Sequence, residues 1–350
     1  MPINRLNRGK SVNRITGTFD IAENSISISN ATDSYQGINP RDGRRYNWKR
    51  IITSRTISVS GSTDGSVNPE TISYNPNNTS NHRKIGQTTF DGRAVDILVV
   101  GGGGGGGCWV AGGGGAGGVI DIPGPAGAMS LSNTSYSITI GGGGGGSENP
   151  GGYGGMPNGA DGSSTTFNGL TALGGGKGAS WDNPNQAGPG GSGGGGTSNS
   201  APGVGVQPSQ GGLSGTYGHG FPGGDDATTN TSHGSAGGGG AMETPGTGPT
   251  TGDAARHGGD GRKPDWMTPY YGDNGYFGGG GGGGNHGGAG IHNSDGGLGG
   301  GGDGRGNGGG PGLSGTNYTG GGGGGEGNTG GSHSQGGSGG HGVVIIGHYY

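Results

Sequence analysis

One segment is the densest aromatic stretch in the second, glycine-rich part of the chain. It reads RKPDWMTPYYGDNGYF, and charged residues accompany its rings. Exposed aromatic rings stack on sugar faces and anchor protein contacts. Two interpretations are open, a recognition loop or a small apolar core beneath a loop, and we favour recognition. The candidate binding residues are Arg262, Lys263, Trp266, Tyr270, Tyr271, Tyr276 and Phe277, with Trp181, Tyr217 and Phe221 as secondary candidates.

A second cluster near the N-terminus interleaves basic with aromatic residues. Up to Val95 the chain carries 13 Lys and Arg against 7 Asp and Glu, whereas beyond it the balance is 5 against 15. Two interpretations are open. The cluster is a docking face for an acidic protein or for nucleic acid, or it is a solvated hairpin surface. The acidic second part has no basic stripe to neutralise phosphates, so we expect no nucleic-acid partner there. The attachment candidates are Arg41, Arg44, Arg45, Tyr46, Trp48, Lys49 and Arg50.

Other patterns that could carry chemistry fail on spacing. The strand-like VDILVV followed by glycines imitates a dinucleotide fingerprint, with Asp121 downstream. That fingerprint needs a helix, and the 13 glycines between Gly101 and Gly118 would cost it on the order of 13 kcal/mol against alanine. A phosphate loop near Lys177 fails at Thr171 and Gly178. We therefore expect no enzyme activity, no cofactor and no metal site.

The single cysteine, Cys108, excludes an internal disulfide and is typical of a packed small side chain rather than a nucleophile. Residues 1–10 carry three basic residues but no apolar stretch of a signal peptide. No apolar run approaches the roughly 20 residues of a membrane span. We therefore expect that the protein does not insert into a membrane. We expect it to be assembled in the cytoplasm.

The elements that must position these side chains are dominated by glycine. The chain holds 107 glycines in 350 residues, with only eight before Ala94. Glycine runs destabilise both helices and strands, so this part is either disordered or uses a backbone that requires glycine. Polyproline-II geometry, with three residues per turn, turns every N–H and C=O outward. Glycine alone lets such rods pack closely enough to bond to one another, and we therefore expect an ordered array of polyglycine-II rods.

Short apolar strands bracket the glycine runs. We expect strands at Val95–Val100, Val119–Ile122, Tyr136–Ile140 and Val343–Ile346, and weaker ones at Ser163–Phe167 and Leu170–Leu173. Between Gly174 and Gly342 no further strand is indicated.

Residues 1–92 read as a small β module. Alternating apolar residues predict strands around Ile26 and Ile28, at Thr56–Ser60 and at Thr71–Asn75. The Asp-Gly pairs at 42–43, 64–65 and 91–92 predict hairpin turns. The fold class is therefore mostly irregular and β: an N-terminal β attachment module at 1–92, then a glycine-rich sandwich at 93–350 framed by short strands, with no α-helical domain.

The segments DILVVGGGGGGG, AGGGGAGGVIDI, YSITIGGGG, GGGKGA and the closing GGHGVVII resemble the glycine-rich domain of bacteriophage tail proteins, over roughly Val95 to Ile346. The chain is also similar in kind to glycine-rich tail-fibre adhesins. The resemblance implies a polyglycine-II sandwich whose inter-rod loops recognise a host surface glycan or outer-membrane protein. The N-terminal part does not match the attachment domain of those adhesins.

The resemblance implies a virion protein, a tail-fibre tip or adhesin, assembled in the host cytoplasm and joined to other virion tail proteins by its N-terminal module. It would be a homo-oligomer, such as a trimer, or a monomer capping a trimeric fibre. Two alternatives stay open: a virion structural or decoration subunit with no receptor role, and a secreted glycine-rich matrix or filament protein.

Overall fold

A computed structural model describes residues 26–60, 95–124, 129–148, 156–181, 186–225, 234–245, 257–286, 294–306, 308–327 and 335–349. The predicted strand at 71–75 and the predicted turns at 64–65 and 91–92 lie outside these ranges. In the described parts the protein is nearly all β and irregular, with one five-residue α-helix, α1 (Gly212–Thr216). The prediction of a mostly β fold with no α-helical domain is confirmed.

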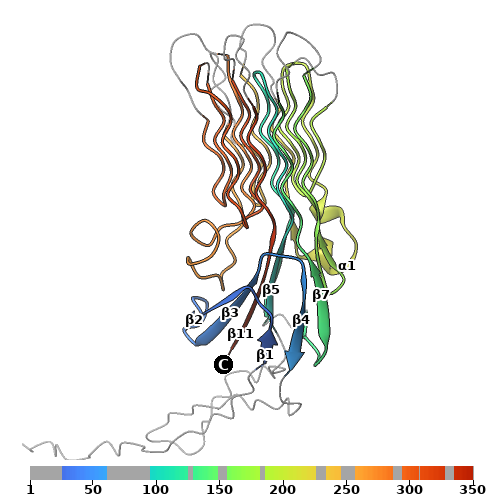
Figure 1. The fold of residues 1–350 in the computed structure, drawn as a ribbon, viewed down its shortest axis with the longest axis vertical. Coiled ribbons are helices and arrows are strands. Elements are labelled where there is room, and N and C mark those ends of the chain that lie inside the picture. The colour runs from blue at the N-terminus through green and yellow to red at the C-terminus, as the bar shows by residue number, and fades with distance from the viewer. Residues whose placement is uncertain are drawn as a thin grey trace, which may run out of the picture.

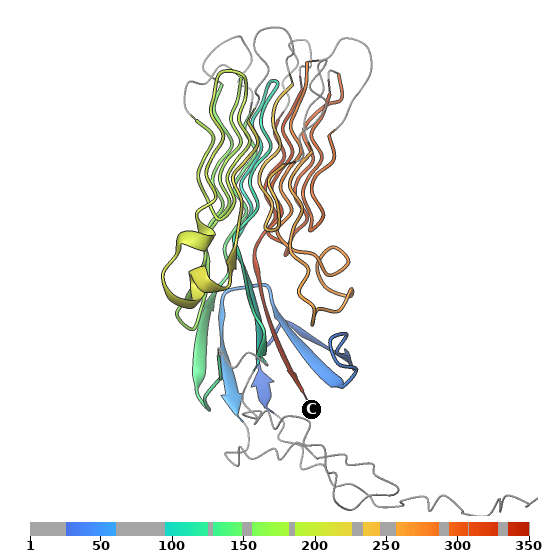
Figure 2. The same ribbon diagram turned by 180° about the vertical axis from the view of Figure 1, so that it is seen from behind.

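Two antiparallel sheets form one end of the molecule, and the glycine segments extend from them along its long axis (Figures 1 and 2). The five-stranded sheet has the order β1 (Ser27–Ser29), β4 (Arg55–Ser60), β7 (Ser135–Thr139), β8 (Thr165–Phe167), β9 (Leu170–Ala172). The six-stranded sheet has the order β10 (Gly218–His219), β6 (Val119–Ile122), β5 (Asp96–Val100), β11 (Val343–Tyr349), β3 (Arg45–Ile51), β2 (Asp33–Ile38).

The apolar strands predicted around the glycine runs are all present, with ends shifted by a few residues, and β11 continues to Tyr349. Strands β2 and β3 were missed because polar and basic residues interrupt their apolar alternation. The Asp42-Gly43 turn is confirmed between β2 and β3, where Gly43 adopts φ +74°, a value that favours glycine. The two-residue β10 was also not expected.

The two sheets enclose one apolar core, and the six-stranded sheet carries a second core on its other face. Alternate residues of one strand serve both, since Ile97 and Val99 point between the sheets while Leu98 and Val100 point outward. The outer core is completed by Trp266, which lies in the segment 262–277. The central strands therefore carry apolar residues on both faces, and this makes such short strands recognisable in the sequence.

The glycine segments are ordered by a hydrogen-bond pattern that repeats every three residues. In the segment 101–107, the N–H groups of residues 101, 104 and 107 donate to residues 118, 115 and 112, over 2.9–3.1 Å. The N–H groups of residues 102 and 105 go to a second neighbour and those of 103 and 106 to a third. Its carbonyl groups accept from three further segments. The six neighbours of this segment are residues 112–118, 160–163, 337–340, 144–147, 175–178 and 323–326.

A three-residue period of partners is what rods with three residues per turn produce when they pack side by side. The segment 112–118 repeats the pattern: it donates to three neighbours and accepts from three. The array thus satisfies its backbone polar groups by pairing them with one another, in place of an apolar core.

Glycine is required in this array because its segments approach each other through their backbones. A Cβ on Gly103 would lie 2.0 Å from the carbonyl oxygen of Gly321, and one on Gly281 would lie 2.1 Å from that of Gly323. Outer positions differ, since a Cβ on Gly145 would meet nothing within 4 Å. The same residue type is therefore indispensable inside the array and replaceable at its surface.

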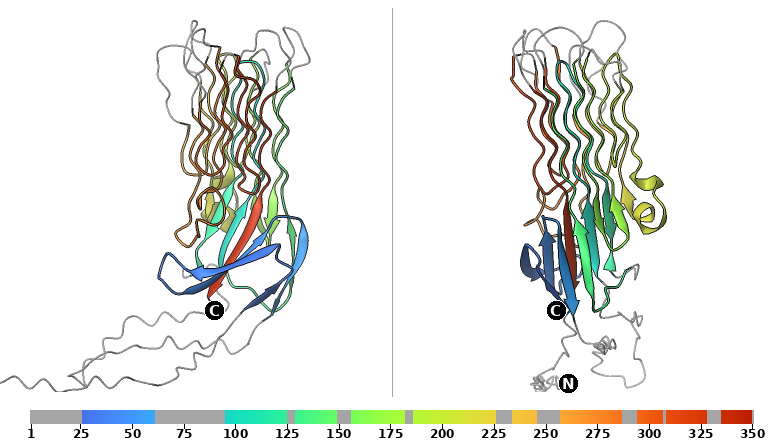
Figure 3. Two further views of the ribbon diagram at one scale, coloured as in Figure 1. Left: turned by 60° about the vertical axis from the view of Figure 1, so that its left-hand side comes forward. Right: turned by 45° about the vertical axis from the view of Figure 1, so that its right-hand side comes forward.

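The first region of the chain is built into the same two sheets as the glycine part. Strand β3 pairs with β11 from Tyr46↔Tyr349 to Ile51↔Val344, and β4 pairs with β7. Figure 3 shows these first strands lying against the later ones. The predicted boundary at residues 92 and 93 lies outside the described ranges and stays a prediction. Residues 26–60, however, do not form a sheet of their own.

Candidate functional site

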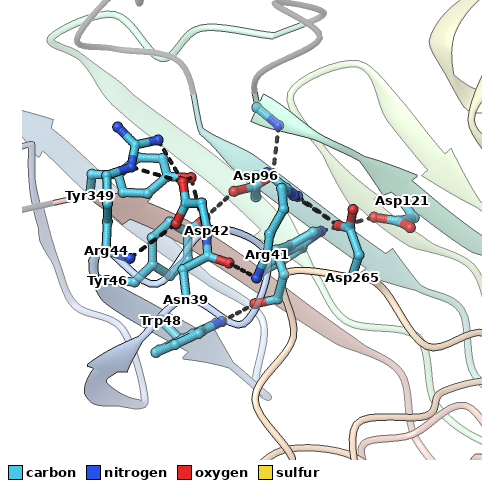
Figure 4. A network of polar contacts seen from close by, with 12 residues as sticks. Asn39, Arg41, Asp42, Arg44, Tyr46, Trp48, Asp96, Asp121, Asp265 and Tyr349 are labelled. Carbon is cyan, nitrogen blue, oxygen red and sulfur yellow. Dashed lines mark hydrogen bonds and ion pairs between the residues drawn. The ribbon is translucent and has the colours of Figure 1, made fainter. Parts of the chain in front are cut away.

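The predicted recognition segment and the predicted attachment cluster lie against each other. The indole Nε1 of Trp48 donates a hydrogen bond to the carbonyl oxygen of Trp266 at 3.0 Å. Arg41 forms ion pairs with both Asp96 and Asp265, each at 2.8 Å (Figure 4). Segments that we expected to have separate roles, attachment and recognition, therefore form one structure beside the six-stranded sheet.

Most aromatic residues of the recognition segment are buried. Trp266, Tyr271 and Phe277 pack in the outer core with Tyr46 and Trp48. A buried ring cannot stack on a receptor, so the alternative interpretation, a small core beneath a loop, describes these three residues. The receptor role expected for them, and the direct docking role expected for Tyr46 and Trp48, do not fit their burial.

Other residues of the segment remain accessible. Tyr270 is 67% exposed, and its ring stacks on that of Tyr35 with centroids 4.8 Å apart. Lys263 is exposed and lies over the half-buried ring of Tyr276. Arg262 is occupied, because it forms an ion pair with Asp121 at 2.8 Å. The segment is thus anchored at its start and presents one ring to solvent.

The basic cluster divides into two faces of the β2–β3 hairpin. Arg44 pairs with Asp42 at 2.7 Å, and Arg50 with Asp33 at 2.5 Å. Arg45 and Lys49 point to the other face and form no ion pair with any residue that the structure describes. These two are the attachment candidates with free charges.

Asp96 is the fully buried carboxylate at the centre of this network. It accepts hydrogen bonds from Arg41, from the hydroxyl of Tyr46 and from the N–H of Gly124. Burial raises the pKa of Asp96, while the bonds from Arg41 and Tyr46 oppose that rise. These contacts join the β2–β3 hairpin to β5. The network therefore stabilises the fold and is not a binding site.

The secondary candidates are scattered. Tyr217 is half-buried and packs against the core between the sheets. Phe221 is exposed. Trp181 is half-exposed, and its N–H donates to the carbonyl oxygen of Trp109 at 3.3 Å. Only Trp181 adjoins the turn described next.

The turn between the segments 101–107 and 112–118 is strained. These segments continue β5 and return to β6, so the turn lies at the end of the array away from the sheets, teal in Figure 1. Trp109 has φ +61° and Val110 has φ +46°. Positive φ is uncommon outside glycine and is a genuine outlier for a β-branched residue such as valine.

Four other segments hold this turn in place. The Cys108 N–H donates to Ser180 Oγ at 3.0 Å and the Trp109 N–H to Glu326 Oε2 at 3.2 Å. Ser235 Oγ donates to the Val110 carbonyl oxygen at 2.5 Å, and Ser147 Oγ donates to Cys108 Sγ at 3.0 Å. Cys108 is buried, and burial raises the pKa of its thiol, which keeps it unreactive as expected of a packed side chain. Nothing in the sequence indicated a turn at Trp109. Tryptophan and valine rarely adopt positive φ, so this pair does not predict such a turn.

Among the described residues, no group of three or more His, Cys, Asp or Glu is placed to hold a metal ion. No helix in the described ranges is long and apolar enough to cross a membrane.

Comparison with known families matches residues 79–349 to a glycine-rich domain. No curated protein matches the chain.

Proposed function

The chain belongs to the glycine-rich domain family, and from that premise we propose that it is a phage virion protein, a tail-fibre tip or adhesin. The glycine array is then a polyglycine-II sandwich that carries recognition segments at its ends. This rests on the resemblance to phage tail proteins and on the three-residue period of the hydrogen bonds. Glycine rods offer no side chains that could distinguish one surface from another, so specificity comes from the segments between them.

The observation that carries the proposal is the turn at Trp109 and Val110. Backbone strain costs of order 1–3 kcal/mol per residue and persists where the surroundings over-determine it, often at binding sites. Here the strained turn lies at the array end farthest from the sheets, and four segments fix it. We therefore place the candidate receptor contact at this end, with Trp109 and Trp181 as its aromatic residues, and no longer at residues 262–277.

Adsorption of particles to the bacterial host tests this proposal. We expect particles carrying Trp109→Ala together with Trp181→Ala to bind the host about thirtyfold more weakly at equilibrium, the effect of losing about 2 kcal/mol at a binding hot spot. The matched control is Phe221→Ala, which removes an exposed ring two residues after β10, on the sheet side of the array, and should adsorb normally. Normal adsorption by the double variant, with the protein located on the particle by immunogold labelling, would instead favour a decoration subunit. Absence of the protein from purified particles would favour a matrix or filament protein.

A further inference from the structure

Strand β2 is the longest edge strand among the described residues, and no other described strand pairs with its outer side. Among the described strands, β1, β9 and β10 form the other three edges of the two sheets, and they span only two or three residues. Short edges, lysines and prolines are the devices by which proteins prevent unwanted strand pairing. Strand β2, with the sequence DSYQGI, has six residues and none of these devices. Its edge is therefore suited to pairing with another strand.

The free backbone groups of β2 follow from its register with β3. The N–H of Asn39 bonds to the carbonyl oxygen of Arg44, and the pairing continues one for one to Asp33↔Arg50. In an antiparallel pair, the backbone groups of alternate residues face the partner. The N–H and C=O groups of Ser34 and Gln36 therefore point away from β3, toward the open edge.

The side chains around this edge indicate what kind of strand it accepts. On one face, Lys49 lies across from the short Ser34, and Arg45 lies across from Ile38, which is 60% exposed. Both cations lack an ion-pair partner in the described parts of the chain. On the other face, the stacked rings of Tyr35 and Tyr270 offer an apolar platform.

The charges beside β2 indicate which kind of strand would bind at its edge. Residues 26–60 carry six Lys and Arg against two Asp, and both aspartates are paired with arginines. Because strands lie about 4.8 Å apart, the side chain of Lys49 can extend over Ser34 toward a strand added to β2. We propose that the edge of β2 binds an extended acidic strand of a partner protein by β-augmentation, with carboxylates toward Arg45 and Lys49 and apolar side chains toward Tyr270. The identity of the partner as a virion tail protein rests on the proposed function, whereas the strand chemistry does not.

A peptide-binding measurement tests this proposal on the full chain. The probe is a fluorescent ten-residue peptide of alternating glutamate and valine, and its anisotropy reports binding. We expect binding that weakens as salt rises, since the ion pairs are exposed. The decisive variants are Gln36→Pro, which removes an outward N–H, and Gln36→Ala, which keeps it. An edge strand tolerates proline at such a position, so both variants should melt close to the wild type.

We expect at least a tenfold loss of peptide affinity for Gln36→Pro, an unchanged affinity for Gln36→Ala and a severalfold loss for Lys49→Ala. Equal binding by the proline and alanine variants would overturn strand addition. Preference for a lysine–valine peptide would overturn the acidic occupant. Self-association of the wild type that Gln36→Pro abolishes would make a second copy the occupant and overturn the proposal as stated. Because the readout is peptide binding, its failure is distinct from a failure of the adsorption experiment.

Discussion

Trp48 donates its indole N–H to the carbonyl oxygen of Trp266, and this bond joins positions 218 residues apart. Both indoles are fully buried in the outer core of the six-stranded sheet. The bond means that the segment 262–277 packs over β3, and that each of the two holds the other in position. Neither can move as an independent binding loop.

We expect Trp48→Phe to lower the free energy of unfolding by about 1–3 kcal/mol, because it leaves a buried carbonyl group without a donor. Trp48→Ala should cost about 3–5 kcal/mol through the added cavity. Chemical denaturation measures both. Tyr270→Ala is the control, since that ring is largely exposed and should cost under about 1 kcal/mol. Equal effects for Trp48→Phe and Tyr270→Ala would contradict the structural role of the bond.

The glycine array should discriminate sharply between inner and outer glycines. Gly281→Ala places a Cβ 2.1 Å from a backbone oxygen of the neighbouring segment, so the rods must separate, at a cost of about 3 kcal/mol or more. Gly145→Ala meets open space and should leave stability unchanged or raise it by about 0.4–1 kcal/mol, because alanine restricts the unfolded chain. Thermal unfolding of the two variants checks this, and equal tolerance would refute close rod packing.

A substitution in the strained turn should affect stability and host binding differently. Asparagine adopts positive φ more readily than tryptophan, so Trp109→Asn should keep the melting temperature or raise it slightly. The same variant should slow adsorption, because the ring is lost. A variant that melts much lower than the wild type would show that Trp109 serves packing instead.

Acid should destabilise the protein partly through histidines that are neutral when folded. Burial, with a smaller contribution from the Arg262 charge, lowers the pKa of His219 to about 4, and burial also lowers the pKa of His348. The unfolded chain binds a proton near pH 6.5 at each histidine, so stability is lost as pH falls from about 6.5 toward 4. We expect His219→Gln to flatten part of that loss in a series of melting curves. An identical pH dependence in wild type and variant would contradict the low pKa of His219.

Removal of residues 1–60 should unfold more than the removed part. It would leave β11 without β3 and β7 without β4, and it would expose both apolar cores. We therefore expect a truncated chain to be insoluble or to exchange its Val343–Ile346 amides rapidly in hydrogen-exchange measurements. A soluble fragment with protected amides in β11 would support a separable module at 1–92.

The sequence alone determined the elements whose chemistry is local. The residues Ile97–Val100 of β5 are a continuous apolar run that ends in glycine, and a run of that kind has few alternatives to a buried strand. The exclusion of an α-helical domain from the glycine region likewise followed from the cost of glycine in a helix. The outward-turned backbone of a three-residue rod predicted a bonded array before any partner was known.

Only the tertiary structure decided which side chains are free. Trp266 and Tyr270 are four residues apart in one aromatic segment, yet one is buried under β3 and the other is exposed. Arg41 and Arg45 look alike in the basic cluster, yet one spans two carboxylates and the other has no ion pair among the described residues. Burial and pairing depend on contacts across more than 200 residues of chain, which composition and spacing do not encode. The strain at Val110 is hidden for the same reason, because four distant segments impose it.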